Sequence, residues 1–356
     1  MSGMWGNNIR VSIFGESHGN AIGINIDGLP SGFHIDMDKV MVEMAKRAPG
    51  KSPLSTPRKE GDIPEILSGY FEGKTTGTPL CAIIRNSNTK SKDYSKLKDV
   101  MRPGHADYTG AMRYDGFNDY RGGGHFSGRI TAPLVFAGAI CKQILESKGI
   151  SIAAHVNSIG SIKDKSFLDV DINEELILSF KGKELPLINS ELEEAMRQEV
   201  MNARKDMDSI GGTIECAVLG IKPGIGNPFF DSVESTLAHL MFSVPAVKGI
   251  EFGKGFDISK MRGSEANDEY YLDGKTIKTK TNNNGGILGG ITNGMPIVFK
   301  VAIKPTASIF KEQSTVNIAT MEETKLSIEG RHDPCIVQRA LPVIEAVTAI
   351  GILELM

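Results

Sequence analysis

Hydrophobic and polar residues alternate with a period of two in several segments of the chain, a pattern that predicts strands. Ile22, Ile24 and Ile26, for example, alternate with small or polar residues. The same pattern predicts strands at residues 9–14, 21–27, 80–84, 213–221 and 297–303. Several of these segments are joined by short turns that contain glycine, which favours antiparallel pairing.

A second group of segments has hydrophobic residues at helical spacing together with residues that start or stop helices. These segments are residues 38–46, 131–148, 190–205, 231–242 and 337–353. The second has Pro133 in its first turn, and the third is expected to open with a capping box of Ser190 and Glu193. The last is expected to kink or to begin at Pro342. Because strands and helices do not alternate one for one, a doubly wound sheet is disfavoured and the predicted class is α+β.

The composition indicates a cytoplasmic enzyme. The 356 residues are 40% hydrophobic, which suffices for a large core. The net charge of −3 argues against a general affinity for nucleic acid, and the apolar run at residues 132–141 is too short to cross a membrane. The four cysteines show no C-x-x-C spacing and the N-terminus does not resemble a signal peptide. We therefore expect reduced thiols and no metal site.

Residues 15–19, Gly-Glu-Ser-His-Gly, have the G-x-S-x-G spacing of the nucleophile elbow of serine hydrolases. That elbow requires a helix after its second glycine, whereas the residues that follow alternate as a strand. Ser17 and His18 are therefore expected on a turn between two strands, with their side chains pointing apart. In that arrangement His18 does not serve as the base for Ser17, and a serine hydrolase is the less favoured alternative.

Polar residues gather in glycine-rich segments outside the predicted helices and strands, where functional residues are common. Besides residues 15–19, these segments are 46–52, 101–110, 119–129, 282–294, 303–309 and 329–335. Arginines and lysines beside glycine N–H groups suit a ligand with several negative charges, and a histidine can protonate a leaving phosphate. His34, His155 and His239 lie elsewhere and are interpreted as structural or surface residues.

Neither a dinucleotide-binding motif nor a P-loop motif is present in the chain. The residues alone therefore indicate an enzyme that acts on a small phosphorylated or polycarboxylated metabolite. Ordinary turns and a solvated basic face remain the structural alternative for the same residues.

Long segments of the chain resemble one family. Residues 15–30, 123–140 and 331–347 are similar to the three signature segments of chorismate synthase, and residues 102–109, 246–256, 285–294 and 304–309 match that family in the expected order. The resemblance covers essentially the whole chain. It implies a single domain, residues 1–356, in which helices are packed between two mainly antiparallel sheets as a β-α-β sandwich. It also implies a homotetramer.

Members of the chorismate synthase family convert 5-enolpyruvylshikimate 3-phosphate to chorismate and phosphate by a 1,4-anti elimination that requires reduced FMN. This is the last common step of the shikimate pathway to aromatic amino acids. The resemblance implies that His18 lies at the substrate's phosphate, that His105 lies next to the flavin, and that Asp333 takes part in removing the ring hydrogen. Ser17 and Ser127 match serines that relay protons or hold flavin and substrate. The Gly-Glu-Ser-His-Gly segment is thereby interpreted as a substrate-binding turn.

The resemblance also assigns binding residues. The arginines expected to bind the substrate are Arg47, Arg102, Arg129 and Arg339. The residues expected to bind FMN are His125, Phe126, Ser127, Ala246, Gly289, Lys304, Pro305, Thr306, Ala307, Ser308 and Arg331.

Two departures from the family pattern concern the source of electrons. Ala48 and Pro53 stand where many relatives have arginines that contact substrate or NADPH, while Arg47 remains as the candidate NADPH contact. The resemblance by itself does not decide between NADPH and an external flavin reductase, and the compact length of 356 residues leads us to favour an external reductase. Residues 46–62 and 304–325 are expected to be long loops that act as lids. A flavin-binding module without elimination activity is the alternative from another functional class.

Overall fold

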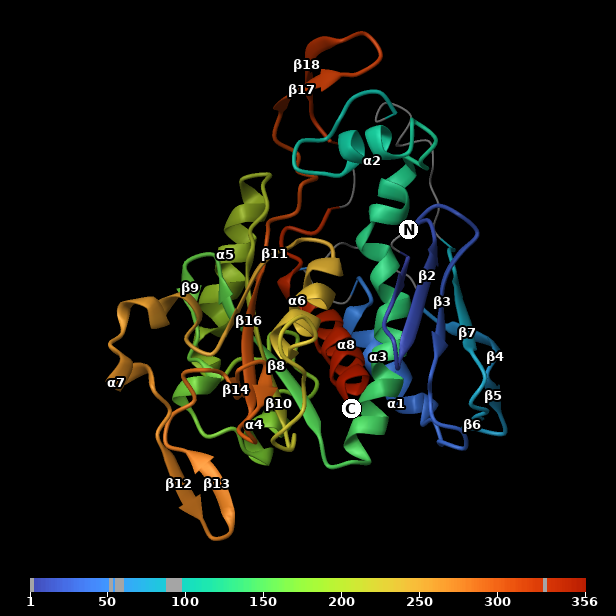
Figure 1. Ribbon diagram of the computed structural model, residues 1–356. Coiled ribbons are helices and arrows are strands. Elements are labelled where there is room, and N and C mark those ends of the chain that lie inside the picture. The colour runs from blue at the N-terminus through green and yellow to red at the C-terminus, as the bar shows by residue number, and fades with distance from the viewer. Residues whose placement is uncertain (1–2, 51–53, 55–60, 88–97, 329–331) are drawn as a thin grey trace.

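The computed structural model describes residues 3–50, 54, 61–87, 98–328 and 332–356. Within these residues, two five-stranded antiparallel sheets lie on opposite sides of a layer of helices (Figure 1). The strand order of the first sheet is β1 (Met4–Trp5), β2 (Arg10–Gly15), β3 (Ala21–Asp27), β7 (Leu80–Arg85), β4 (Pro64–Ser68). The strand order of the second is β11 (Val247–Phe252), β16 (Ile297–Ile303), β10 (Gly212–Leu219), β8 (Ser151–Ile159), β9 (Ile162–Lys163).

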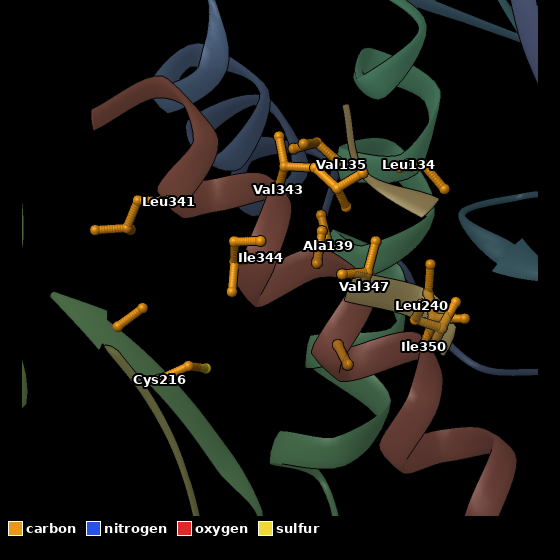
Figure 2. Packing of buried hydrophobic residues seen from close by; sticks show 14 of the residues in the cluster. Leu134, Val135, Ala139, Cys216, Leu240, Leu341, Val343, Ile344, Val347 and Ile350 are labelled. Carbon is orange, nitrogen blue, oxygen red and sulfur yellow. The ribbon is translucent and has the colours of Figure 1, made fainter. Parts of the chain in front are cut away.

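The centre of the helical layer is formed by α3 (Thr131–Glu146) and α8 (Val337–Leu355), which are buried on nearly all sides. The helix α1 (Met37–Arg47) packs against both, and α6 (Val233–Ser243) packs against α8 and β11. Figure 2 shows the aliphatic side chains of α3 and α8 facing one another. A helix that is apolar all round is stable only when it is covered on every side, and the two sheets supply that cover.

The two central helices approach closely at Gly138. A Cβ atom there would lie 2.3 Å from the Cα atom of Ala346, so any side chain would push α3 and α8 apart. One turn further along α3, the Nζ atom of Lys142 lies 2.9 Å from a carboxylate oxygen of Glu43 and 2.5 Å from one of Glu345. Burial raises the pKa of Glu43, but Lys142 and Lys46 together lower it to about 2.

Shorter elements complete the described chain. The remaining α-helices are α2 (Asp107–Arg113), α4 (Glu174–Ser179), α5 (Glu193–Lys205) and α7 (Gly263–Ala266), and short 3-10 helices lie at Arg121–Phe126, Gly128–Ile130, Phe167–Asp169, Ser190–Leu192 and Gly255–Lys260. The separate hairpins are β5 (Tyr70–Phe71) with β6 (Lys74–Thr75), β12 (Tyr270–Asp273) with β13 (Thr276–Thr279), β14 (Ile287–Leu288) with β15 (Ile291–Thr292), and β17 (Gln313–Asn317) with β18 (Glu322–Leu326). The hairpins β12–β13 and β17–β18 project from the body of the molecule (Figure 1).

The predicted fold class is confirmed, since helices lie between two antiparallel sheets. Two of the predicted strands, residues 21–27 and 297–303, have the observed bounds of β3 and β16. The strand β8 was not predicted, because its sequence is buried for most of its length and so lacks the alternation of a half-exposed strand.

Two details of the predicted helices are wrong. Ser190 and Glu193 do not form a capping box: Ser190 opens a 3-10 turn capped by Asn189, and no side chain caps α5, which begins at Glu193. Of the two alternatives for the last helix, a start at Pro342 is wrong, since α8 starts at Val337 and continues through the proline, and a kink there stays a prediction.

Residues 304–325 are not one long loop, because β17 and most of β18 pair there as a hairpin with Gln313 opposite Leu326. Of the other expected loop, residues 51–53 and 55–60 lie outside the described residues. Within the described chain no helix is long and apolar enough to span a bilayer, and no group of three or more His, Cys, Asp or Glu side chains is arranged to hold a metal ion.

Candidate active site

The turn between β2 and β3 carries Ser17 and His18, which are both buried, with 1% and 6% of their surface exposed. The Oγ atom of Ser17 lies 3.0 Å from Nδ1 of His18. The expectation that these side chains point apart is wrong, because residues 16–19 form a tight turn, closed by a hydrogen bond from Gly19 N to Glu16 O (3.0 Å), and alternation holds only for extended backbone. The strand β3 follows at Ala21, so the helix of a nucleophile elbow is absent at this point.

A run of three glycines lies between the two candidate catalytic histidines. Gly122, Gly123 and Gly124 have φ angles of 59°, 88° and 53°, which residues other than glycine rarely adopt. A Cβ atom at Gly122 would lie 2.1 Å from Cε1 of His18, and one at Gly123 would lie 3.0 Å from Cε1 of His105. The same short segment therefore contacts both imidazoles. A side chain at Gly122 would press against His18, and one at Gly123 would press against His105.

His105 belongs to a compact group with Arg102 and Asp107. Its Nδ1 atom lies 2.7 Å from Oδ1 of Asp107 and 3.1 Å from Nη2 of Arg102, and Arg102 donates two further hydrogen bonds of 2.7 Å to the same carboxylate. Burial raises the pKa of Asp107, but the hydrogen bonds from Arg102 and His105 lower it by more than burial raises it. The pKa of Asp107 therefore lies below its usual range. With Nδ1 held, the Nε2 atom of His105 is left on the side of Gly123.

The expected FMN-binding loop, residues 304–308, packs against the turn that carries His105. Lys304 Nζ donates to the carbonyl of Gly104 (2.5 Å), and Nη1 of Arg102 lies 3.4 Å from Oγ of Ser308. The N–H of Lys304 donates to the carbonyl of Ala246 (2.9 Å). These contacts bring Lys304, Ser308 and Ala246 into the neighbourhood of His105.

Three of the predicted substrate-binding arginines gather around two carboxylates. Asp62 accepts one hydrogen bond from Nη2 of Arg47 and one from Nη1 of Arg129. Arg339 donates through Nη1 to Asp333 (2.5 Å) and through Nε to the carbonyl of Arg47 (3.1 Å). Burial lowers the pKa of Arg47, Asp62 raises it, and the nearby Arg339 and Arg129 lower it, with a net shift downward.

Asn86 joins this arginine cluster to the turn of Ser17 and His18. Its Oδ1 atom accepts from Nε of Arg129 (3.1 Å), and its Nδ2 atom donates to the carbonyls of Glu16 and Gly19, both at 2.9 Å. Asn86 and Asp62 lie in no motif, and Asp107 lies in the segment 102–109 without having been assigned a role, so sequence reasoning missed all three. The only available signal was the position of Asp107 two residues after His105.

The remaining predicted residues are placed as follows. His125 is exposed and its Nδ1 atom lies 2.8 Å from the carbonyl of Gly15, while the Phe126 ring packs on Tyr114. Ser127 Oγ accepts the N–H of Arg129 (3.3 Å), so it caps the turn before α3.

The carbonyl of Thr306 accepts from Oγ of Ser209 (2.7 Å), and the next residue, Ile210, donates its N–H to the carbonyl of Pro334 (2.8 Å). These contacts tie the 304–308 loop to the neighbourhood of Asp333.

Gly289 lies on the exposed turn between β14 and β15, where a Cβ atom would meet no described atom within 4 Å. Arg331 lies outside the described residues.

A family model described as chorismate synthase matches residues 9–356. The chain belongs to the chorismate synthase family. A crystal structure of chorismate synthase superimposes with a TM-score of 0.75 at 30% sequence identity, covering 99% of this chain and 92% of that chain.

Curated chorismate synthases are similar over their full length. The protein from Dehalococcoides mccartyi is 45% identical, covering 100% of this chain and 96% of its own. Those from Thermococcus kodakarensis and Methanocaldococcus jannaschii are 44% and 46% identical, each over 99% of this chain and 96% and 95% of theirs. The comparisons support neither a serine hydrolase at Ser17 nor a flavin-binding module without elimination activity.

Proposed function

We propose that this chain converts 5-enolpyruvylshikimate 3-phosphate to chorismate and phosphate by 1,4-anti elimination, with reduced FMN as its cofactor. The observation that carries this proposal is the single set of contacts that joins three groups: the turn of Ser17 and His18, the group around His105, and the arginine cluster around Asp62. The reaction is inferred from family membership, and the residues proposed to carry it out are inferred from this set of contacts.

The substrate carries a phosphate and two carboxylates, so its site needs an excess of positive charge. Arg47 and Arg129 form ion pairs with Asp62, and Arg339 forms one with Asp333, so three guanidinium groups lie within one region of the molecule. Forked guanidinium groups suit phosphate and carboxylate oxygens, which supports this region as the site of an anionic substrate.

The residues present fit a bound flavin at the 304–308 loop. The Oγ1 atom of Thr306 is buried without a hydrogen-bond partner in the described structure, which is costly unless a ligand satisfies it. Lys304 and Arg102 place positive charge at the two ends of the same loop, which suits an anionic cofactor. His125, Phe126, Ser127, Ala246, Gly289 and Arg331 are proposed to complete the site. Reduced FMN held there would supply reversible one-electron chemistry, which would allow phosphate to leave without net redox change.

The chain's own residues are proposed to hold the substrate and to move protons. His18, with its Nδ1 atom held by Ser17, donates a proton to the departing phosphate. His105, with its Nδ1 atom held by Asp107, keeps a proton at Nε2 on the flavin side of the site. Asp333, oriented by Arg339, accepts the ring proton, and the glycine run closes the space between the two histidines against water.

We further propose that an external flavin reductase supplies the electrons. Ala48, at the C-terminal end of α1, stands where many relatives have an arginine, and its methyl group offers no positive charge to NADPH. Pro53 lies outside the described residues. A cytoplasmic homotetramer is proposed from the family resemblance.

The test is release of phosphate and chorismate from 5-enolpyruvylshikimate 3-phosphate without oxygen. Three reactions are compared: FMN reduced with dithionite, oxidised FMN, and oxidised FMN with NADPH. Turnover only with pre-reduced FMN supports both the reaction and the need for a reductase. Turnover with NADPH as well contradicts the need for a reductase, and no turnover in any reaction contradicts the proposed function.

A further inference from the structure

We propose that Asp62 is a positioning residue for substrate binding, which holds the guanidinium groups of Arg47 and Arg129 side by side and keeps Arg129 in place against the turn of His18. The inference rests on the proposed function and names the residue that prepares its anion-binding site.

Asp62 lies between the two arginines in space, although they come from distant parts of the chain. Arg47 is the last residue of α1, and Arg129 lies in the 3-10 turn that leads into α3. Each oxygen of the Asp62 carboxylate accepts from a different arginine. The three side chains are 1% to 5% exposed, so solvent does not screen the charges.

Two buried guanidinium groups repel one another when no anion lies between them. Burial raises the pKa of Asp62, whereas Arg47 and Arg129 lower it, and the pKa lies below its ordinary value. The carboxylate therefore stays charged, and its charge allows both arginines to occupy one small region before substrate arrives. Removing the negative charge of Asp62 takes away the anion that both arginines share, and the arginines are then expected to move apart.

The pair also retains hydrogen-bonding capacity and a link to the catalytic turn. Nε of Arg47 is buried and has no hydrogen-bond partner among the described residues, so this arginine has a donor left for an anion. Arg129 is held at Nε by Asn86, which also holds the carbonyls of Glu16 and Gly19. A shift of Arg129 is therefore transmitted to the turn that carries His18.

The backbone at Asp62 agrees with a specific role for the side chain. Its φ angle is 45°, in the left-handed region that residues other than glycine seldom adopt. This conformation directs the carboxylate of a residue just before β4 towards α1 and α3. The two arginine contacts hold the residue in that conformation.

The experiment compares the wild type with Asp62→Asn, Asp62→Glu and a matched control, Asp164→Asn. Asp164 is 4% exposed and paired with His155 on the second sheet, so it shares the burial of Asp62 but not its arginines. Steady-state KM and kcat are measured with reduced FMN. The dissociation constant of the substrate is measured by titration calorimetry of the enzyme with oxidised FMN, which separates binding from turnover.

We expect Asp62→Asn to raise KM and the dissociation constant of the substrate by roughly 10- to 100-fold, because misplaced binding groups lose about that much. The kcat value at saturation should fall less than KM rises, and FMN affinity should stay within about twofold. Asp62→Glu keeps the charge and should lie between the wild type and Asp62→Asn. Asp164→Asn should lower the melting temperature and leave KM unchanged.

A KM and a dissociation constant within twofold of the wild type in both Asp62 variants would overturn the inference, whether or not the melting temperature falls. Should Asp62→Asn fail to fold, an unchanged KM in Asp62→Glu overturns it equally, and a raised KM supports it. Absence of turnover by the wild type contradicts the proposed function instead, and the calorimetric comparison still decides whether Asp62 prepares an anion site.

Discussion

Asp107 binds His105 and Arg102 through the same carboxylate, with 2.7 Å between His105 Nδ1 and Asp107 Oδ1. Asp107 is the first residue of α2, so the position of the His105 imidazole depends on the start of that helix. A carboxylate that holds Nδ1 fixes both the orientation of the ring and the tautomer that the other nitrogen presents.

We predict that Asp107→Asn lowers kcat by roughly 10- to 100-fold, because the amide cannot hold His105 in the same tautomer and orientation. FMN affinity should change little, and both are measured by anaerobic kinetics and flavin titration. Asp208→Asn, which removes a surface partner of Lys311, is the control and should leave kcat unchanged. Equal kcat values for Asp107→Asn and the wild type would show that this carboxylate has no part in orienting His105.

Replacement of His18 by alanine should reduce kcat by roughly two to four orders of magnitude, the range expected for a positioned proton donor. Binding of oxidised FMN, followed by its absorbance, should be retained. His34→Ala is the matched control, since His34 lies at a β-bridge with Lys74 away from the turn. Full activity of the His18 variant would refute its assignment.

Gly122→Ala should impair turnover more than Gly128→Ala, although the two glycines are only six positions apart. A Cβ atom at Gly122 would collide with His18 at 2.1 Å, and the φ angle there is positive, whereas a Cβ atom at Gly128 meets nothing within 4 Å. We expect kcat for Gly122→Ala to fall at least about tenfold, since small displacements of catalytic groups have effects of that order or larger. The measurement is anaerobic turnover of both variants, and equal activities would contradict contact between the glycine run and His18.

His155 should make stability depend on pH. It is 0% exposed and lies 3.0 Å from Glu215 and 3.3 Å from Asp164. Burial lowers the pKa of His155, but its hydrogen bonds with the two carboxylates raise it above its ordinary value of 6.5. Burial raises the pKa of both carboxyls, yet their hydrogen bonds bring them below 3.8 for Asp164 and 4.5 for Glu215.

The sign of the pH effect follows from these directions. The stabilisation by charged His155 is complete below pH 6.5 and is lost as the pH rises through the folded pKa. The stabilisation by the two carboxylates is complete above pH 4.5 and is lost as the pH falls through their folded pKa values. His155→Gln should therefore lower the melting temperature more at pH 5.5 than at pH 9, as measured by thermal unfolding. A loss of equal size at both values would exclude a charged His155 in the folded protein.

The sequence by itself determined the helices and strands in which hydrophobic residues recur with a clear period. Alternating Ile22, Ile24 and Ile26 predicted β3 with its observed bounds, because these isoleucines share one buried face while Asn25 on the other face is exposed. The fully buried β8 has no such contrast between its faces, so its sequence offered no period to read. The glycine-rich segments also marked where the candidate site lies, and the family motifs supplied His18, His105 and the arginines.

Only the tertiary structure decided how those residues act on one another. Asp62 is separated from Arg129 by 67 positions, and Asn86 is separated from the turn it holds by about as many. Contacts between distant segments leave no period and no spacing in the sequence. The direction of a side chain on a turn is likewise set by the folded backbone, which is why Ser17 and His18 meet although alternation predicted that they point apart.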